Sequence, residues 1–328
     1  MSLSAADAED AAADAVLLAA PAVKRIVKSL SLPGGLVKAA TLVGCLKALE
    51  LETTLLNDLE VVSGSSSGAI VAALVACRWS ADEIAQLLIE DCDIVKDMLS
   101  CRNPLDLSIV NIVWRLWRHR AIDDGAKMYT FMGEHFGDIT FQQVKDVYDR
   151  DLVVTASCYT TRRLVRFSRL TTPDMPIRTA LRASCAYPGL FLPADIKGRV
   201  YYDGGLMCNL PLRYTDEMFP HTRDYALGMQ FDFSHRDTMA FMWECNRWPG
   251  IVQIAANVAS LFFYRIAHLD ALLTHAYASR VVKIPSDGHA SLSELYGSKD
   301  YISLYSDKAT MRRMVTFGRV FTANWLKN

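Results

Sequence analysis

The chain has 328 residues, of which 51% are hydrophobic and 22% are charged, and this balance excludes a mainly disordered protein. The length is sufficient for one large domain or two ordinary ones. Lysine and arginine together number 35 against 36 for aspartate and glutamate, so the net charge is −1. A chain of this charge has no overall attraction to nucleic acid, and no nucleic-acid partner is expected.

Residues 1–28 are alanine-rich, and we expect them to form a leader that is helical or loosely ordered. Acidic residues such as Asp7 and Glu9 distinguish this stretch from the basic start of a signal peptide. No uninterrupted apolar run approaches the roughly 20 residues that a membrane-spanning helix requires. The eight cysteines are scattered without a metal-ligand spacing, which is typical of reduced core residues. These features predict a cytoplasmic protein, dissolved or peripheral on a membrane.

From Ser29 onward, short apolar runs alternate with segments of helical spacing. The runs typical of strands are Ser29–Leu32, Leu59–Val62, Leu152–Ser157, Leu164–Ser168, Val200–Tyr202, Tyr225–Gln230 and Val281–Ile284. Helices are expected at Leu36–Glu50, at Ala69–Cys77, after capping boxes that start at Ser80 and Thr140, and from Lys308 onward. Strands that alternate with helices indicate an α/β layered fold around a largely parallel sheet. No repeat or linker divides the chain, so one domain is expected.

The segment Gly64-Ser65-Ser66-Ser67-Gly68 lies between a predicted strand and a predicted helix. A glycine- and serine-rich segment can be a flexible linker, but this setting is the strand–turn–helix of a nucleophile elbow centred on Ser66. The two glycines permit a sharp turn with close approach of the backbone. The following helix places its positive end at the Ser66 hydroxyl, where it stabilises developing negative charge.

A second glycine-rich segment, Pro33-Gly34-Gly35-Leu36-Val37-Lys38, follows the first predicted strand and opens a helix. It can be an ordinary turn, or its free backbone N–H groups can hold an anion. Neither of the usual glycine-rich nucleotide-binding patterns is satisfied, so a nucleotide site is disfavoured.

Asp203 lies in the third motif, Tyr201-Tyr202-Asp203-Gly204-Gly205-Leu206, and directly follows a predicted strand. An Asp-Gly pair often marks only a turn. At the end of a strand, however, the carboxylate is well placed to act as a general base. The motif closes with Asn209-Leu210-Pro211.

These three motifs, in this order, resemble the patatin-like phospholipase family. Three further segments resemble it as well: Gly44–Glu50, Phe136–Phe141 and Leu181–Phe191. The resemblance implies a three-layer α/β/α sandwich with a mostly parallel central sheet. It implies a catalytic core over residues 29–216, with residues 217–328 completing the same domain.

The resemblance also assigns the site residues. Ser66 corresponds to the nucleophile and Asp203 to the base of a dyad without histidine. The oxyanion loop corresponds to Gly34, Gly35 and Leu36, with Lys38 at its basic position. The motif glycines are Gly64, Gly68, Gly204 and Gly205. The family hydrolyses acyl esters of phospholipids or neutral lipids through an acyl-enzyme, and neither a cofactor nor a metal is expected.

Two positions depart from the family pattern. Leu36 stands at the place of the third glycine of the loop, and Ala39 at the place of the glycine after the basic residue. A backbone N–H of leucine can still donate if its φ and ψ suit an L-residue. A catalytically weak protein that binds a lipid or a partner is therefore an alternative.

A Ser–His–Asp esterase is a second alternative. Its histidine would follow Asp203 in the chain, as His221, His235 and His289 do. The seven histidines show neither a metal-ligand nor a triad signature, so the dyad is preferred.

The segment Val113–Arg120 is basic and aromatic. It can be an amphipathic helix whose tryptophans pack into the core. Alternatively, it can lie on a membrane or a lipid-droplet surface, with tryptophan at headgroup level and arginine towards anionic lipid. The candidate membrane contacts are Trp114, Arg115, Trp117, Arg118 and Arg120.

Overall fold

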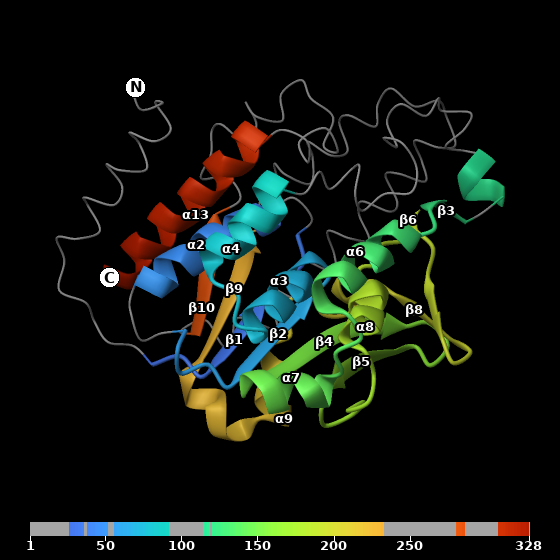
Figure 1. Ribbon diagram of the computed structural model, residues 1–328, viewed down its shortest axis with the longest axis horizontal. Coiled ribbons are helices and arrows are strands. Elements are labelled where there is room, and N and C mark those ends of the chain that lie inside the picture. The colour runs from blue at the N-terminus through green and yellow to red at the C-terminus, as the bar shows by residue number, and fades with distance from the viewer. Residues whose placement is uncertain are drawn as a thin grey trace.

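A computed structural model describes residues 26–35, 38–51, 56–91, 114–118, 120–232, 280–285 and 308–327. One sheet in this part of the chain has eight strands, in the order β10-β9-β1-β2-β4-β8-β7, with β5 also paired to β4 (Figure 1). The strands of this path are β10 (Val281–Pro285), β9 (Ala226–Asp232), β1 (Ser29–Leu32), β2 (Val61–Ser65), β4 (Asp151–Cys158), β8 (Arg199–Tyr202) and β7 (Ala194–Ile196). The pairs from β10 to β4 are parallel, whereas β5 (Arg163–Ser168), β8 and β7 pair antiparallel. The predicted α/β fold with a mostly parallel sheet is confirmed.

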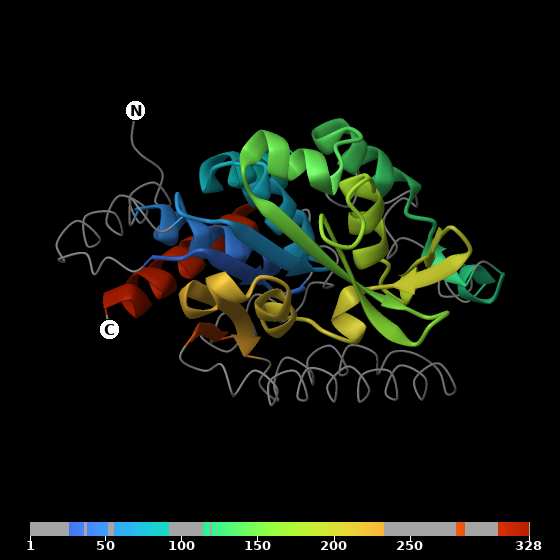
Figure 2. The same ribbon diagram turned by 90° about the horizontal axis from the view of Figure 1, so that it is seen from below.

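Helices cover both faces of this sheet because successive side chains of a strand point to opposite faces. On β2, Val62 belongs to the large core that includes α3 (Ser67–Ala76). Its neighbour Val61 packs instead with Phe219, just after α9 (Leu212–Met218). Figures 1 and 2 show α9 on the opposite side of the sheet from α7 and α8. Every residue of β1, β2 and β4 is buried, as expected for strands of a sheet that is covered on both faces.

The remaining helices lie mainly on the face of α3. They are α2 (Ala39–Leu51), α4 (Ala81–Ala85), the π-helical turn Gln86–Asp91, α6 (Ala126–Phe136), α7 (Phe141–Tyr148), α8 (Ile177–Ser184) and α13 (Lys308–Lys327), with two short 3-10 turns at Gly204–Leu206 and Pro220–Tyr225. A small second sheet pairs β3 (Ala121–Asp123) with β6 (Gly189–Phe191) in parallel.

Two glycines bring α13 directly onto α2, and Figure 1 shows the two helices side by side. A Cβ added to Gly318 would meet the carbonyl oxygen of Thr41 at 2.1 Å, and one added to Gly44 would meet that of Val315 at 1.9 Å. Since real Cβ atoms do not approach backbone so closely, the helices touch backbone to backbone at these positions. Met311, Met314 and Val315 of α13 are buried there.

The order of pairing on β4 brings two strand ends together. β5 and β8 both pair with Ser157 and Cys158, so they occupy opposite edges of β4. β2 and β5 pair with some of the same residues of β4, so they too must lie on opposite edges of that strand. β2 and β8 therefore lie on the same edge of β4. β2 ends with Ser65 opposite Thr155, and β8, which runs the other way, ends with Tyr202 opposite Ser157. The ends of β2 and β8 therefore face each other, and the residues that follow these two strands lie close together.

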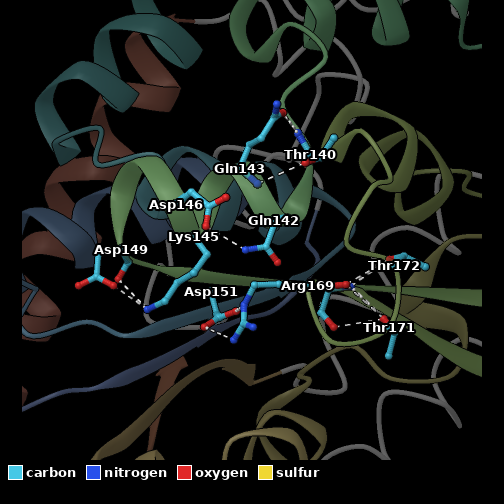
Figure 3. A network of polar contacts seen from close by, with 11 residues as sticks. Thr140, Gln142, Gln143, Lys145, Asp146, Asp149, Asp151, Arg169, Thr171 and Thr172 are labelled. Carbon is cyan, nitrogen blue, oxygen red and sulfur yellow. Dashed lines mark hydrogen bonds and ion pairs between the residues drawn. The ribbon is translucent and has the colours of Figure 1, made fainter.

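A polar network anchors α7 and the start of β4 (Figure 3). The Thr140 hydroxyl accepts a hydrogen bond from the Gln143 N–H, and the Gln143 side chain accepts one from the Thr140 N–H. Asp151 opens β4 and receives two hydrogen bonds from the Arg169 guanidinium, at 2.8 and 3.3 Å. The capping box predicted at Thr140 is confirmed, as is the one at Ser80.

The predicted strands all exist, with ends that shift by up to three residues. The helix predicted over Leu36–Glu50 corresponds to α2, which spans Ala39–Leu51, and residues 36–37 lie outside the described residues. The final helix does begin at Lys308. Apart from residues 26–28, the predicted leader over residues 1–28 lies outside the described residues, as does Leu36.

Candidate active site

Ser66 occupies the sharp turn between β2 and α3, with φ 53° and ψ −131°. A positive φ is costly for a residue with a side chain, and surrounding structure must hold it. The flanking glycines allow the required contacts: a Cβ on Gly64 would meet the Gly68 carbonyl oxygen at 2.4 Å, and a Cβ on Gly68 would meet that of Pro33 at 2.3 Å. The segment thus has the strand–turn–helix geometry of a nucleophile elbow.

Asp203 follows β8 and faces Ser66 across the gap between the two strand ends. The Ser66 hydroxyl donates a hydrogen bond to Asp203 Oδ2 at 2.6 Å, and the Gly205 N–H donates to Oδ1 at 2.8 Å. The residues are 137 positions apart in the sequence. Ser157 fixes the backbone here, since its hydroxyl donates to the Asp203 carbonyl oxygen at 2.8 Å.

The surroundings of Asp203 make it a stronger base than an ordinary carboxylate. Only 3% of the residue is exposed. Burial raises its pKa from 3.8 to about 6, against the opposing effect of the hydrogen bonds from Ser66 and Gly205. Such a carboxylate is still largely ionised at neutral pH, and it accepts a proton from a hydroxyl more readily than one with a pKa near 4.

The backbone of Ser66 is held by a residue from α8. The Ser66 N–H donates to the Ser184 hydroxyl at 2.8 Å, and Ser184 is fully buried. The sequence reasoning missed this contact, although Ser184 lies in Leu181–Phe191, one of the segments that resemble the family. The resemblance of that segment to the family was the one feature of the sequence that pointed to Ser184.

The same segment places Cys185 and Tyr187 near Asp203. Burial raises the pKa of both side chains, and the negative charge of Asp203 raises them further. Neither residue was predicted at the site. Both side chains therefore stay neutral beside the carboxylate at neutral pH.

The glycine-rich loop packs directly against the elbow. A Cβ on Gly34 would meet Ser66 Cβ at 2.8 Å and Asn209 Oδ1 at 2.7 Å. Asn209 also donates from Nδ2 to the Gly34 carbonyl oxygen at 3.1 Å. The asparagine of the third motif therefore joins the loop to the segment that carries Asp203, a role that the sequence reasoning did not assign.

Gly35 and Lys38 of this loop are held by contacts with each other, with Ser67 and with Phe231. The Gly35 N–H donates to the Ser67 hydroxyl at 3.1 Å, and the Lys38 N–H donates to the Gly35 carbonyl oxygen at 3.0 Å. The Lys38 ammonium lies 5.7 Å from the centroid of the Phe231 ring, close enough for a cation–π contact. Phe231, on β9, gave no sequence signal of a role at the site.

His221 does not lie near Asp203. Its Nε2 lies 3.0 Å from Glu60 Oε2, and Glu60 directly precedes β2, whereas Ser66 directly follows that strand. Six residues of extended chain separate the two by about 20 Å. The other candidates for a triad, His235 and His289, lie outside the described residues.

The basic and aromatic segment contains a short helix over residues 114–118. Trp114 is 52% exposed and Trp117 is 80% exposed, so their packing in the core is excluded. Arg118 and Arg120 are exposed, whereas Arg115 donates to the Ile122 carbonyl oxygen at 3.0 Å.

In the part of the chain that the structure describes, no helix combines the length and apolar character needed to cross a membrane. Within the same residues, no group of three or more histidine, cysteine, aspartate or glutamate side chains is arranged to hold a metal ion.

A sequence model of the patatin-like phospholipase family matches residues 30–216, more than half of the chain. The chain belongs to this family. Both Ser66 and Asp203 lie within the matched residues, while β9, β10 and α13 of this patatin-like protein lie beyond them. The suspected family membership is therefore confirmed.

Several curated relatives are similar to this patatin-like protein. Protein R571 of Acanthamoeba polyphaga mimivirus is 28% identical over 62% of this chain and 65% of its own length. A probable lipid hydrolase of Invertebrate iridescent virus 6, 463L, is 28% identical over 66% of this chain and 74% of its own. A patatin-like phospholipase domain-containing protein of Pyricularia oryzae is 31% identical, and the match covers 58% of this chain but 25% of the fungal protein. The chain thus spans less than two thirds of two of these relatives.

Among solved structures, VipD from Legionella pneumophila is similar, with a TM-score of 0.51 at 18% sequence identity. The match covers 94% of this chain and 67% of VipD. At this level of identity, the likeness supports the fold of this patatin-like protein alone.

Proposed function

We propose that this protein hydrolyses acyl esters of lipids, with Ser66 as nucleophile and Asp203 as general base. The observation that carries the proposal is the 2.6 Å hydrogen bond from the Ser66 hydroxyl to Asp203. A serine hydroxyl is a weak nucleophile until an adjacent base takes its proton, and a buried carboxylate with a pKa of about 6 can do so.

The reaction proceeds in two halves. Asp203 takes the Ser66 proton as Oγ attacks the ester carbonyl carbon, and the resulting tetrahedral intermediate expels the alcohol, which takes up that proton. The product of this half is an ester of the acyl group with Ser66. In the second half, Asp203 takes a proton from water, the hydroxide oxygen attacks the acyl carbon, and Ser66 recovers the proton as the fatty acid leaves.

The negative charge of the intermediate is stabilised by the glycine-rich loop and the positive end of α3. The loop offers the backbone N–H groups around Gly34 and Gly35, with the Lys38 ammonium close by. Because the Gly35 N–H already donates to Ser67, it must exchange this partner for the developing oxyanion. A donor that is already free and aimed at the oxyanion contributes about 3–4 kcal/mol, and the exchange at Gly35 reduces that gain.

Family membership and the name of the iridescent-virus relative support a lipid as the substrate. We propose phospholipid or neutral lipid, without a cofactor or metal. The exposed Trp114 and Trp117 support a peripheral contact of the helix over residues 114–118 with a membrane or lipid-droplet surface. We further propose that residues 217–328 complete the domain, because β9 and β10 belong to its sheet and α13 packs on α2.

A fluorophosphonate probe tests the nucleophile, and a panel of phospholipids and neutral lipids tests the substrate class. We expect the wild-type protein to be labelled and Ser66→Ala to be neither labelled nor active. Ser80→Ala serves as the control, since Ser80 caps α4 away from Asp203. Lipid binding without labelling would instead favour the catalytically weak protein suggested by Leu36 and Ala39.

A further inference from the structure

Two turns at one end of the sheet present a cluster of exposed cations. Arg162 lies in the β4–β5 turn and Arg163 opens β5, while Lys197 lies in the β7–β8 turn and Arg199 opens β8. Tyr159, which opens the first turn, is 55% exposed. We call these five residues the hairpin patch.

Contacts between the two turns hold the patch together. The Tyr159 N–H donates to the Val200 carbonyl oxygen at 2.8 Å, and the Val200 N–H donates to the Thr160 hydroxyl at 3.0 Å. The Arg162 guanidinium lies 4.6 Å from the centroid of the Tyr159 ring. The charges are therefore arranged on paired strands and need little ordering when a ligand binds.

The charge of the hairpin patch is not neutralised by neighbouring acids. Among the residues that the structure describes, none of its four cations forms an ion pair with a carboxylate. Asp195, exposed in the β7–β8 hairpin, accepts the Gly198 N–H at Oδ1 at 2.9 Å, and its single negative charge is outnumbered by the four cations. Some surface arginines elsewhere do form such pairs, as Arg312 does with Glu90. The patch therefore attracts anions locally, although the chain as a whole has a net charge of −1.

The patch adjoins the candidate active site. The last residue of β2 pairs with Thr155 of β4, and β4 continues for three more residues. This length places the β4–β5 turn about 10 Å past the level of the elbow. The rings of Tyr159 and Tyr202 pack edge to face at 6.1 Å between centroids, and Tyr202 directly precedes Asp203. Figures 1 and 2 both show these turns, together with the short helix over residues 114–118, at the end of the molecule away from α2 and α13.

We propose that the hairpin patch docks on an anionic lipid surface and thereby brings the Ser66–Asp203 pair to its substrate. This rests on the proposed function, which makes lipid the substrate. The four cations match the charge of anionic headgroups, and the exposed tyrosine suits the boundary between headgroups and acyl chains. The tryptophans of the 114–118 helix, at the same end, contact the same surface.

Vesicle sedimentation in the Ser66→Ala background tests the docking without hydrolysis. One variant neutralises three patch residues (Arg162→Gln, Arg163→Gln, Lys197→Gln). The matched control neutralises three exposed cations elsewhere (Arg223→Gln, Lys283→Gln, Arg313→Gln), so both variants have the same net charge. Binding to vesicles of phosphatidylcholine and phosphatidylserine in equal parts should weaken on the order of a hundredfold in the patch variant and little in the control.

Hydrolysis of a soluble short-chain ester, measured with Ser66 restored, should be unchanged by the patch substitutions. Equal binding by the patch variant and the parent, equal weakening in both variants, or no preference of the parent for vesicles that contain phosphatidylserine would overturn the docking proposal. Unchanged vesicle binding together with lost binding to a DNA duplex would assign the patch to nucleic acid and overturn it as well. Patch-dependent vesicle binding without any ester hydrolysis would support the docking surface and refute the proposed function.

Discussion

The backbone N–H of Ser66 donates to the hydroxyl of Ser184, 118 residues away, and this bond holds the candidate nucleophile in a conformation with positive φ. Residues in such regions cost on the order of 1–3 kcal/mol and persist only where neighbours fix them. The last residue of α8 therefore determines how accurately the Ser66 hydroxyl faces Asp203.

The first prediction removes this support. Ser184→Ala should lower kcat about ten- to a hundredfold, because misplacement of a reacting group by a fraction of an ångström is costly. It should also lower the free energy of unfolding by about 1–3 kcal/mol, since a buried N–H loses its acceptor. Ser184→Thr, which retains a hydroxyl, should recover part of the rate. Ser31→Ala breaks a buried 2.7 Å bond to Ser63 and serves as the control, with lower stability but an unchanged rate.

The second prediction concerns the pair itself. Asp203→Asn keeps the shape of the side chain but not the base, so it should reduce turnover about as far as Ser66→Ala, by about a thousandfold or more. The double variant should be scarcely worse than either single one, because the two residues act as a unit. His221→Gln should retain activity, as His221 contacts Glu60. An inactive but folded His221→Gln variant would contradict the dyad.

The third prediction is the pH dependence of activity. Asp203 must be ionised to accept a proton, and its pKa is raised to about 6. Accordingly, kcat/KM should rise as the pH increases through about 6 and then level off, with one ionisation on the acidic side. An initial-rate profile on a soluble ester measures this. A midpoint near 4 would show that Asp203 is not desolvated in solution.

The fourth prediction concerns stability. Between the unfolded pKa of 3.8 and the folded value of about 6, the folded state binds more protons than the unfolded state, so stability contributed by Asp203 falls as the pH rises. Above pH 6 the buried charge has its full cost, at most about 3 kcal/mol. Asp203→Asn should thus be more stable than wild type at pH 8 and no more stable near pH 4. Urea unfolding at both pH values checks this, and an advantage that does not change with pH would contradict it.

The fifth prediction tests the contact between α2 and α13. Gly318→Ala places a methyl group against the Thr41 carbonyl, so the free energy of unfolding should fall by about 2 kcal/mol or more despite the better helix propensity of alanine. Val320→Ala, at an exposed position of the same helix, is the control. If Gly318→Ala leaves the free energy of unfolding unchanged, α13 is not fixed on the core.

Local features of this protein are determined by its sequence. The apolar runs specify β1, β2 and β4, and the short-range side-chain bonds at Ser80 and Thr140 specify where α4 and α7 begin. The order of a strand, a turn of glycine and serine, and a helix singles out Ser66, since only local geometry is needed to make an elbow. Asp203 is singled out more weakly, by its position after a strand and by the resemblance to the family. Strands of three residues, such as β3 and β6, cannot be predicted in this way because they are too short to show a periodic pattern of apolar residues.

Only the tertiary structure decided that these residues meet. β2 and β8 share one edge of β4 and end opposite Thr155 and Ser157, which brings Ser66 and Asp203 within hydrogen-bond distance. Strand order depends on contacts between residues far apart in the chain, which no local pattern encodes. The same holds for the pKa of Asp203, because burial is a property of all the elements packed around the carboxylate. The contact of the Ser184 hydroxyl with the Ser66 N–H also depends on tertiary structure, since the packing of α8 decides which group this serine contacts.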